Sequence, residues 1–100
     1  MMHEPDNIPD WVLETLSAYV KTGRPTGDFL YACLTNNLIE AIGRADAHSF
    51  QHLGNIMSWI YNRAPSVCWR TEEAVNDWIK NGGAKGLGLN TELDYYAKVD

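Results

Sequence analysis

Apolar residues recur at helical spacing in the first quarter of the chain. On a helix drawn at 100° per residue, one face between Pro9 and Gly23 collects Val12, Leu13, Leu16, Tyr19 and Val20. A proline suits the first helical turn, and a glycine with a proline shortly after it is typical of a helix end. The pattern therefore predicts a first helix from Pro9 to Gly23.

A second helix is predicted from Thr26 to Gly43. Thr26 can cap its first turn, where the helix dipole favours an acid such as Asp28. Its apolar side consists of Leu30, Cys33, Leu34, Leu38 and Ala41. Asn37 projects from the middle of that side. A buried amide without a hydrogen bond costs about 1–3 kcal/mol, so Asn37 either bonds a neighbouring backbone group or loop, or lines a pocket.

A third helix carries two stripes of larger residues. Asp46 can cap its start, and it should end before Pro65, because the residue preceding a proline avoids the helical region. The core stripe is predicted to hold Phe50, Leu53, Met57, Ile60, Tyr61 and Ala64. The stripe on the opposite side holds His48, His52, Asn55 and Trp59.

Trp59 is the unusual member of the second stripe, because a tryptophan buries its large apolar area only where something covers it. Three interpretations stay open. The helix is central and packed on both sides, or Trp59 anchors a subunit or partner interface, or the ring stacks on a ligand in a pocket.

A fourth helix is predicted to start at Thr71 and to end at Gly82-Gly83. Its inward side consists of Ala74, Val75, Trp78 and Ile79. The segment before it, residues 61–70, reads YNRAPSVCWR. We expect Val67 and Trp69 to tuck under this corner as a hydrophobic plug.

Strand signals are nearly absent, since the chain shows no sustained alternation of apolar and polar residues. We therefore predict an all-α protein, a compact bundle of four main helices with short loops. The predicted organisation is a flexible start over residues 1–8, a helical domain over 9–81, and a glycine-rich tail over 82–100. A short fifth helix starting at Thr91 is an option within the tail.

Composition narrows the classes of function. The chain has 100 residues, 45% of them hydrophobic, which is enough for one core. A net charge of −5 argues against bulk binding to nucleic acid or anionic lipid. No apolar run approaches the roughly 18 residues of a membrane span, and the first eight residues are not a secretory signal. Cys33 and Cys68 are expected to be buried thiols in a reducing cytoplasm.

Catalytic and metal-binding patterns are weak. His48 and His52 have the spacing of two metal ligands on a helix, but the residues between them lack the glutamate of a zinc-protease helix and no third ligand is indicated. The glycine-rich stretch 82–88 follows no strand and lacks the lysine of a phosphate loop, which favours a flexible linker. No nucleophile, base and orienting group are apparent together. We predict no enzyme, no cofactor and no metal site.

We predict instead that the chain is a binding protein, and two kinds of binding partner fit its residues. The stripe of His48, His52, Asn55 and Trp59 would contact a host protein or a second copy of the chain. The alternative is an anionic, nucleotide-like ligand, because arginine forks bind phosphates and aromatic rings stack on bases. The residues for that ligand would be Asn37, Arg44, Tyr61, Arg63, Trp69 and Arg70.

Several short motifs, spread over roughly residues 8–81, resemble motifs of a known group of proteins. They are Pro25 with Phe29-Leu30, Leu34 with Asn36-Asn37-Leu38, Arg44-Ala45-Asp46, Tyr61-Asn62, Pro65, Trp69, and Trp78-Ile79. In these the chain resembles a group of small, mostly uncharacterised proteins encoded by tailed bacteriophages and prophages.

The chain departs from that group at two places. Such proteins tend to have Asn-Asp-Leu where this chain has Asn36-Asn37-Leu38, and Trp-Gly-Ser where it has Trp69-Arg70-Thr71. The resemblance carries over no catalytic residue. It implies a small accessory protein of phage type in the cytoplasm of a bacterial host, and by analogy an inhibitor of host machinery or defence.

Overall fold

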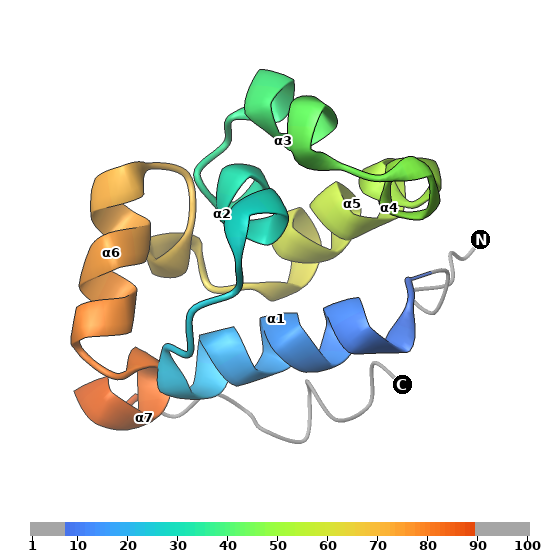
Figure 1. Cartoon of the computed structure of the whole chain (residues 1–100). Helices are drawn as coiled ribbons and strands as arrows, with labels where there is room; N and C mark the ends of the chain where they lie inside the picture. The colour runs from blue at the N-terminus through green and yellow to red at the C-terminus, as the bar shows by residue number, and fades with distance from the viewer. Residues whose placement is uncertain (1–7, 90–100) are drawn as a thin grey trace.

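The computed structural model describes residues 8–89, and these residues form helices and no strand (Figure 1). The prediction of an all-α protein is confirmed. The elements are α1 (Asp10–Thr22), α2 (Asp28–Leu34), α3 (Leu38–Arg44), α4 (Ala47–Gln51), α5 (Leu53–Arg63), the 3-10 turn η1 (Ser66–Cys68), α6 (Glu72–Lys80) and α7 (Gly83–Leu87). The predicted four-helix bundle is not confirmed, because the second and third predicted helices each divide in two. The option of a helix from Thr91 falls outside the described residues.

Helix α1 is the element that matches its prediction best. The residues that it buries are those of the predicted face: Val12, Leu13, Leu16, Tyr19 and Val20. It ends where predicted, since Gly23 adopts a left-handed conformation with φ 76° and its N–H donates to the carbonyl of Tyr19 at 2.8 Å. In the view of Figure 1, α1 runs along the lower side of the molecule, with α2 and α5 above it.

The second predicted helix breaks at the two asparagines. Asn36 takes a positive φ of 63°, and Asn37 caps α3 by accepting the N–H of Glu40 on its Oδ1 at 3.2 Å. The prediction that Asn37 lies inside an apolar helix face is therefore wrong, and the residue is exposed. Asparagine favours caps and turns because its side chain bonds the nearby backbone. Thr26 is not the cap of α2, whose N-cap is Gly27.

The third predicted helix breaks at His52, between α4 and α5. Its predicted start is confirmed, since Asp46 accepts the N–H of Ser49 at 2.7 Å. That hydrogen bond lowers the pKa of the Asp46 carboxyl. Its predicted end is confirmed too, because Ala64, just before Pro65, leaves the helical region.

The break changes which residues of this segment are buried. Helix α5 buries Leu53, Ile56, Trp59 and Ile60. The core prediction is wrong for Phe50 and Tyr61, which are 55% and 70% exposed. Phe50 lies beyond the break at His52, and Tyr61 stands one residue past the buried face of α5. A single continuous helical repeat therefore misplaces both.

Helix α7 lies within the stretch that was expected to be a linker, and that expectation is wrong for residues 83–87. It packs against α1 through an approach of bare backbone. A Cβ on Gly23 would stand 2.7 Å from the nitrogen of Gly83, so neither glycine has room for a side chain. The absence of side chains at Gly83 and Gly23 therefore lets the backbone of α7 pack directly against the end of α1.

Helix α6 lies beside η1 and α7. Thr71 caps α6 as predicted, accepting the N–H of Ala74 at 3.0 Å. In the view of Figure 1, α6 stands on the left, α7 lies below it, and α3 forms the top of the molecule. None of the helices in residues 8–89 is long and apolar enough to cross a membrane.

The contact between Gly23 and Gly83 predicts that alanine destabilises the fold at Gly83 but not at a glycine that faces open space. Gly83→Ala should lower the free energy of unfolding by more than about 1 kcal/mol, because φ is +69° and the new Cβ would meet the backbone of Thr22. Gly54→Ala is the matched control in α5, where a Cβ meets open space. It should be neutral or stabilise by up to about 1 kcal/mol. Denaturant unfolding of both variants checks this, and equal effects would contradict the packing of α7.

Candidate functional site

The predicted partner stripe is not a single surface. Trp59 is only 3% exposed, whereas His48 and Asn55 are exposed. The rings of His48 and His52 meet edge to face, with centroids 5.1 Å apart. Packing on both sides of the helix does not account for Trp59, because Trp59 lies on the one buried face of α5 with Leu53, Ile56 and Ile60, and the opposite side of α5 is exposed. Within residues 8–89 no group of histidine, cysteine and carboxylate side chains is arranged to hold a metal ion.

The residues proposed for a nucleotide-like ligand are brought together only in part. Tyr61 and Trp69 meet edge to face with ring centroids 6.1 Å apart, and the guanidinium of Arg70 lies 4.7 Å from the centroid of the Trp69 ring. Arg44 is engaged elsewhere, in ion pairs with Asp28 at 3.1 Å and Glu40 at 2.9 Å. Asn37 is used as the cap of α3, and Arg63 ends α5.

Arg70 has an unusual backbone. Its φ is 104°, in a region that favours glycine. Strain of this kind costs about 1–3 kcal/mol. Two contacts offset it: the Arg70 N–H donates to the carbonyl of Leu34 at 2.7 Å, and its guanidinium covers Trp69.

The corner between α5 and α6 is packed differently from the prediction. Val67 is 60% exposed, so it is not part of a plug. The buried residue of η1 is Cys68, whose carbonyl accepts the hydroxyl of Tyr19 at 2.6 Å. Trp69 is half-buried against the core. The apolar side chain of Val67 is left at the surface beside α6.

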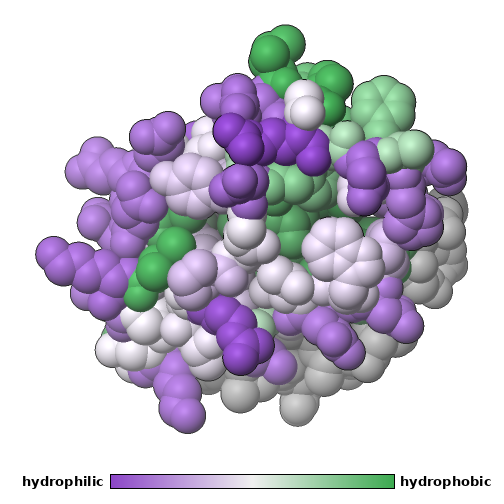
Figure 2. Space-filling view, in the orientation of Figure 1, coloured by the Kyte–Doolittle hydropathy of each residue, from purple (hydrophilic) through white to green (hydrophobic). Residues whose placement is uncertain are grey.

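Helix α3 presents an apolar surface that the sequence pattern did not predict. Leu38, Ile39 and Ile42 are 49%, 79% and 43% exposed, and Ala41 is the one residue of the helix that is buried. Figure 2 shows hydrophobic surface gathered over α3, at the top of the view. Leu38 was expected to continue the core face of α2, but the turn at Asn36 and Asn37 directs α3 elsewhere. The two adjacent asparagines were the signal in the sequence.

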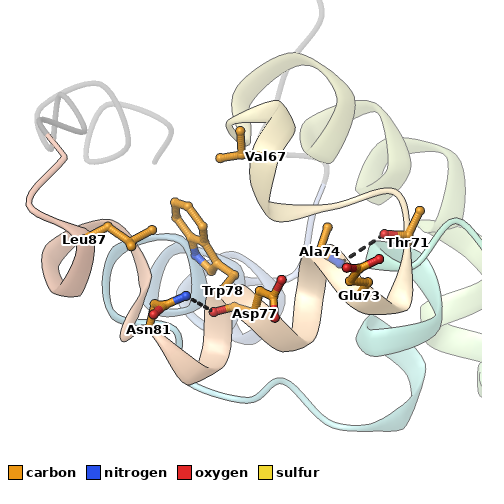
Figure 3. Close-up of a pocket in the computed structure, with 8 residues that line it drawn as sticks. All are labelled: Val67, Thr71, Glu73, Ala74, Asp77, Trp78, Asn81 and Leu87. Atoms are coloured by element: carbon orange, nitrogen blue, oxygen red, sulfur yellow. Dashed lines mark hydrogen bonds between the residues drawn. The ribbon is translucent and has the colours of Figure 1, made fainter.

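A second candidate is a groove of about 400 Å³ beside α6 (Figure 3). Its lining residues come from η1, α6 and α7 and from the loops next to them: Val67, Thr71, Glu73, Ala74, Asp77, Trp78, Asn81 and Leu87. Trp78 points into the space between Val67 and Leu87, and its Nε1 donates to the carbonyl of Tyr19 at 2.9 Å. The groove therefore has a fixed aromatic floor and two carboxylates at its side.

The two thiols are poorly suited to nucleophilic chemistry. Cys33 and Cys68 are both fully buried and neither forms a disulfide. Burial raises the pKa of each thiol to about 12, so both are protonated at neutral pH. Burial also raises the pKa of the Tyr19 hydroxyl well above its usual range, which keeps that group a hydrogen-bond donor.

Comparison with known proteins found no matching family model, no matching curated protein and no matching solved structure.

The thiol pKa values predict that stability falls at alkaline pH. Above the usual thiol pKa of 9.0, the unfolded chain loses protons from Cys33 and Cys68 while the folded chain keeps them up to about 12. The free energy of unfolding is therefore highest below pH 9 and declines above it. Denaturant titrations between pH 7 and pH 9.8 measure the slope. Cys33→Ala should flatten the decline, and an unchanged slope would contradict the account.

Proposed function

We propose that this chain is a non-enzymatic binding protein that docks on another protein through the apolar face of α3. The observation that carries the proposal is the exposure of Leu38, Ile39 and Ile42 on a helix of seven residues. Single exposed aliphatic side chains are common on protein surfaces. Three neighbouring ones on one short helix, by contrast, are typical of an interaction surface.

The face is held rigidly in place, which favours binding. Ala41 anchors α3 against the core, and Asn37 caps its start. Arg44 ties its last turn to Asp28, at the start of α2, and to Glu40. A helix that is already ordered loses little conformational entropy when it docks, so more of the apolar contact remains as affinity.

The partner that fits is a protein with an apolar groove bordered by basic residues. On a short helix Ile42 neighbours both Leu38, four residues before it, and Ile39, three residues before it, and amphipathic helices fill such grooves with residues at these spacings. The net charge of −5 favours a basic border. A second copy of this chain carries the same acidic charge, which makes it the less complementary partner.

The biological setting of the proposal comes from the resemblance to phage accessory proteins. We place the protein in the cytoplasm of a bacterial host, where it would bind and inhibit a component of host machinery or defence. The nucleotide-binding alternative draws less support. Arg44 already pairs with two carboxylates, and the guanidinium of Arg70 already lies over the Trp69 ring.

A pair of substitutions in α3 tests the proposal. Ile39→Ser with Ile42→Ser should leave the free energy of unfolding within about 1 kcal/mol, because both side chains are substantially exposed. It should reduce capture of the partner from a bacterial lysate at least tenfold, because it removes the apolar anchors. Quantitative mass spectrometry of the captured proteins is the measurement.

The matched control is Trp11→Ser on α1, which removes an apolar side chain that is 48% exposed. Capture should survive that change. A photo-crosslinking residue at position 39 should link the same partner, and one at position 11 should not. Capture that is equal in all variants, or lost equally in the control, would refute docking through α3.

A further inference from the structure

The groove beside α6 has a regular arrangement along the helix. Glu73, Asp77 and Asn81 follow one another at intervals of four residues and form its polar side. Ala74 and Trp78 are offset by one residue and form its floor. The opposite walls come from Val67 in η1 and Leu87 in α7 (Figure 3). The groove therefore has polar side chains along α6, the Trp78 ring as its floor, and the aliphatic side chains of Val67 and Leu87 as its walls.

The walls of the groove are uncovered. Val67 is 60% and Leu87 44% exposed, so a molecule lying in the groove would remove apolar surface from water on both sides. The volume of about 400 Å³ is at the lower end of the range for ligand pockets and suits one long side chain with its adjoining backbone.

The charge on the polar side lacks a partner within residues 8–89. Glu73 and Asp77 are exposed, and neither carboxylate forms an ion pair with a described cation. Two carboxylates four residues apart repel each other. Asp77 also lies in the last turn of α6, where the helix dipole favours a cation and disfavours an acid. A cation from outside the described chain would relieve both effects.

Arginine fits this combination better than other cations. Its planar guanidinium offers five N–H donors, and carboxylates four residues apart can both accept from it. Asn81 continues the polar side one turn beyond Asp77, where its Nδ2 donates to the Asp77 carbonyl at 2.8 Å. The methylene groups of the arginine would lie against Val67 and Leu87.

We propose that this groove binds an arginine side chain of a basic protein segment, with the guanidinium at Glu73 and Asp77 and the aliphatic stem between Val67 and Leu87. The inference rests on the proposed function in one respect, that the ligand is a protein. It concerns α6 and not α3, so the two surfaces can be tested separately.

The probe is a blocked pentapeptide with one central arginine flanked by leucines, titrated into the full chain and followed by calorimetry and by amide NMR shifts. We expect saturable binding with a Kd below about 1 mM, with the largest shifts in residues 71–81. The same peptide with citrulline in place of arginine has no charge and should bind at least tenfold more weakly. No saturable binding at about 10 mM, or equal binding of the citrulline peptide, would overturn the proposal.

The decisive variant is Glu73→Gln with Asp77→Asn, which keeps the shape of the groove and removes both charges. We expect at least a tenfold loss of affinity. The matched control is Glu14→Gln with Glu72→Gln, which removes the same charge from exposed positions outside the groove lining. An equal loss in the control would mean diffuse attraction and would overturn the assignment.

Two further arms separate this inference from docking through α3 and from a small-molecule site. Ile39→Ser with Ile42→Ser should leave peptide affinity unchanged even where it abolishes capture of the partner, so each idea can fail alone. Blocked free arginine should bind at least tenfold more weakly than the peptide, because it lacks the flanking chain. Peptide binding that is lost in the α3 variant, or equal affinity for free arginine, would overturn the proposal.

Discussion

Tyr19 is the residue on which the arrangement around α6 depends. It is completely buried near the end of α1. Its hydroxyl donates to the carbonyl of Cys68 in η1, and its carbonyl accepts the indole N–H of Trp78 in α6. The same carbonyl accepts the N–H of Gly23, which ends α1 and begins the backbone contact with Gly83. One residue thus orients three of the elements that line the groove: η1, α6 and α7.

The parts of the fold that the sequence predicts are those decided by local chemistry. The caps at Asp46 and Thr71 and the helix end at Gly23 follow from side chains and backbone preferences within a few residues. The break at Asn37 also has a local cause, the capping hydrogen bond of its side chain, but the apolar pattern continues through Asn37 and through His52, so that pattern predicts neither break. The position of α7 depends on two distant glycines whose backbones touch, and no periodicity of side chains encodes such a contact.

The difference between local and distant causes also explains which surface clusters the sequence predicted and which it missed. Tyr61, Trp69 and Arg70 do come together, since they flank one short corner. The apolar face of α3 was not predicted, because the helical repeat places Leu38 on the core face and only the structure shows that the turn at Asn36 exposes it. Two residues near these surfaces have a clear backbone role: Asn37 caps the start of α3, and Arg70 holds a strained positive φ.

The measurement that tests the role of Tyr19 most directly is native-state hydrogen exchange in Tyr19→Phe, which removes only the hydroxyl. The unpaired carbonyl of Cys68 should cost about 1–3 kcal/mol. Protection of the Trp78 indole N–H and of the amides of η1 and α6 should therefore fall about tenfold or more, while α3 and α4 change less. Unchanged protection at Trp78, or an equal loss throughout the chain, would contradict the claim that Tyr19 holds these elements together.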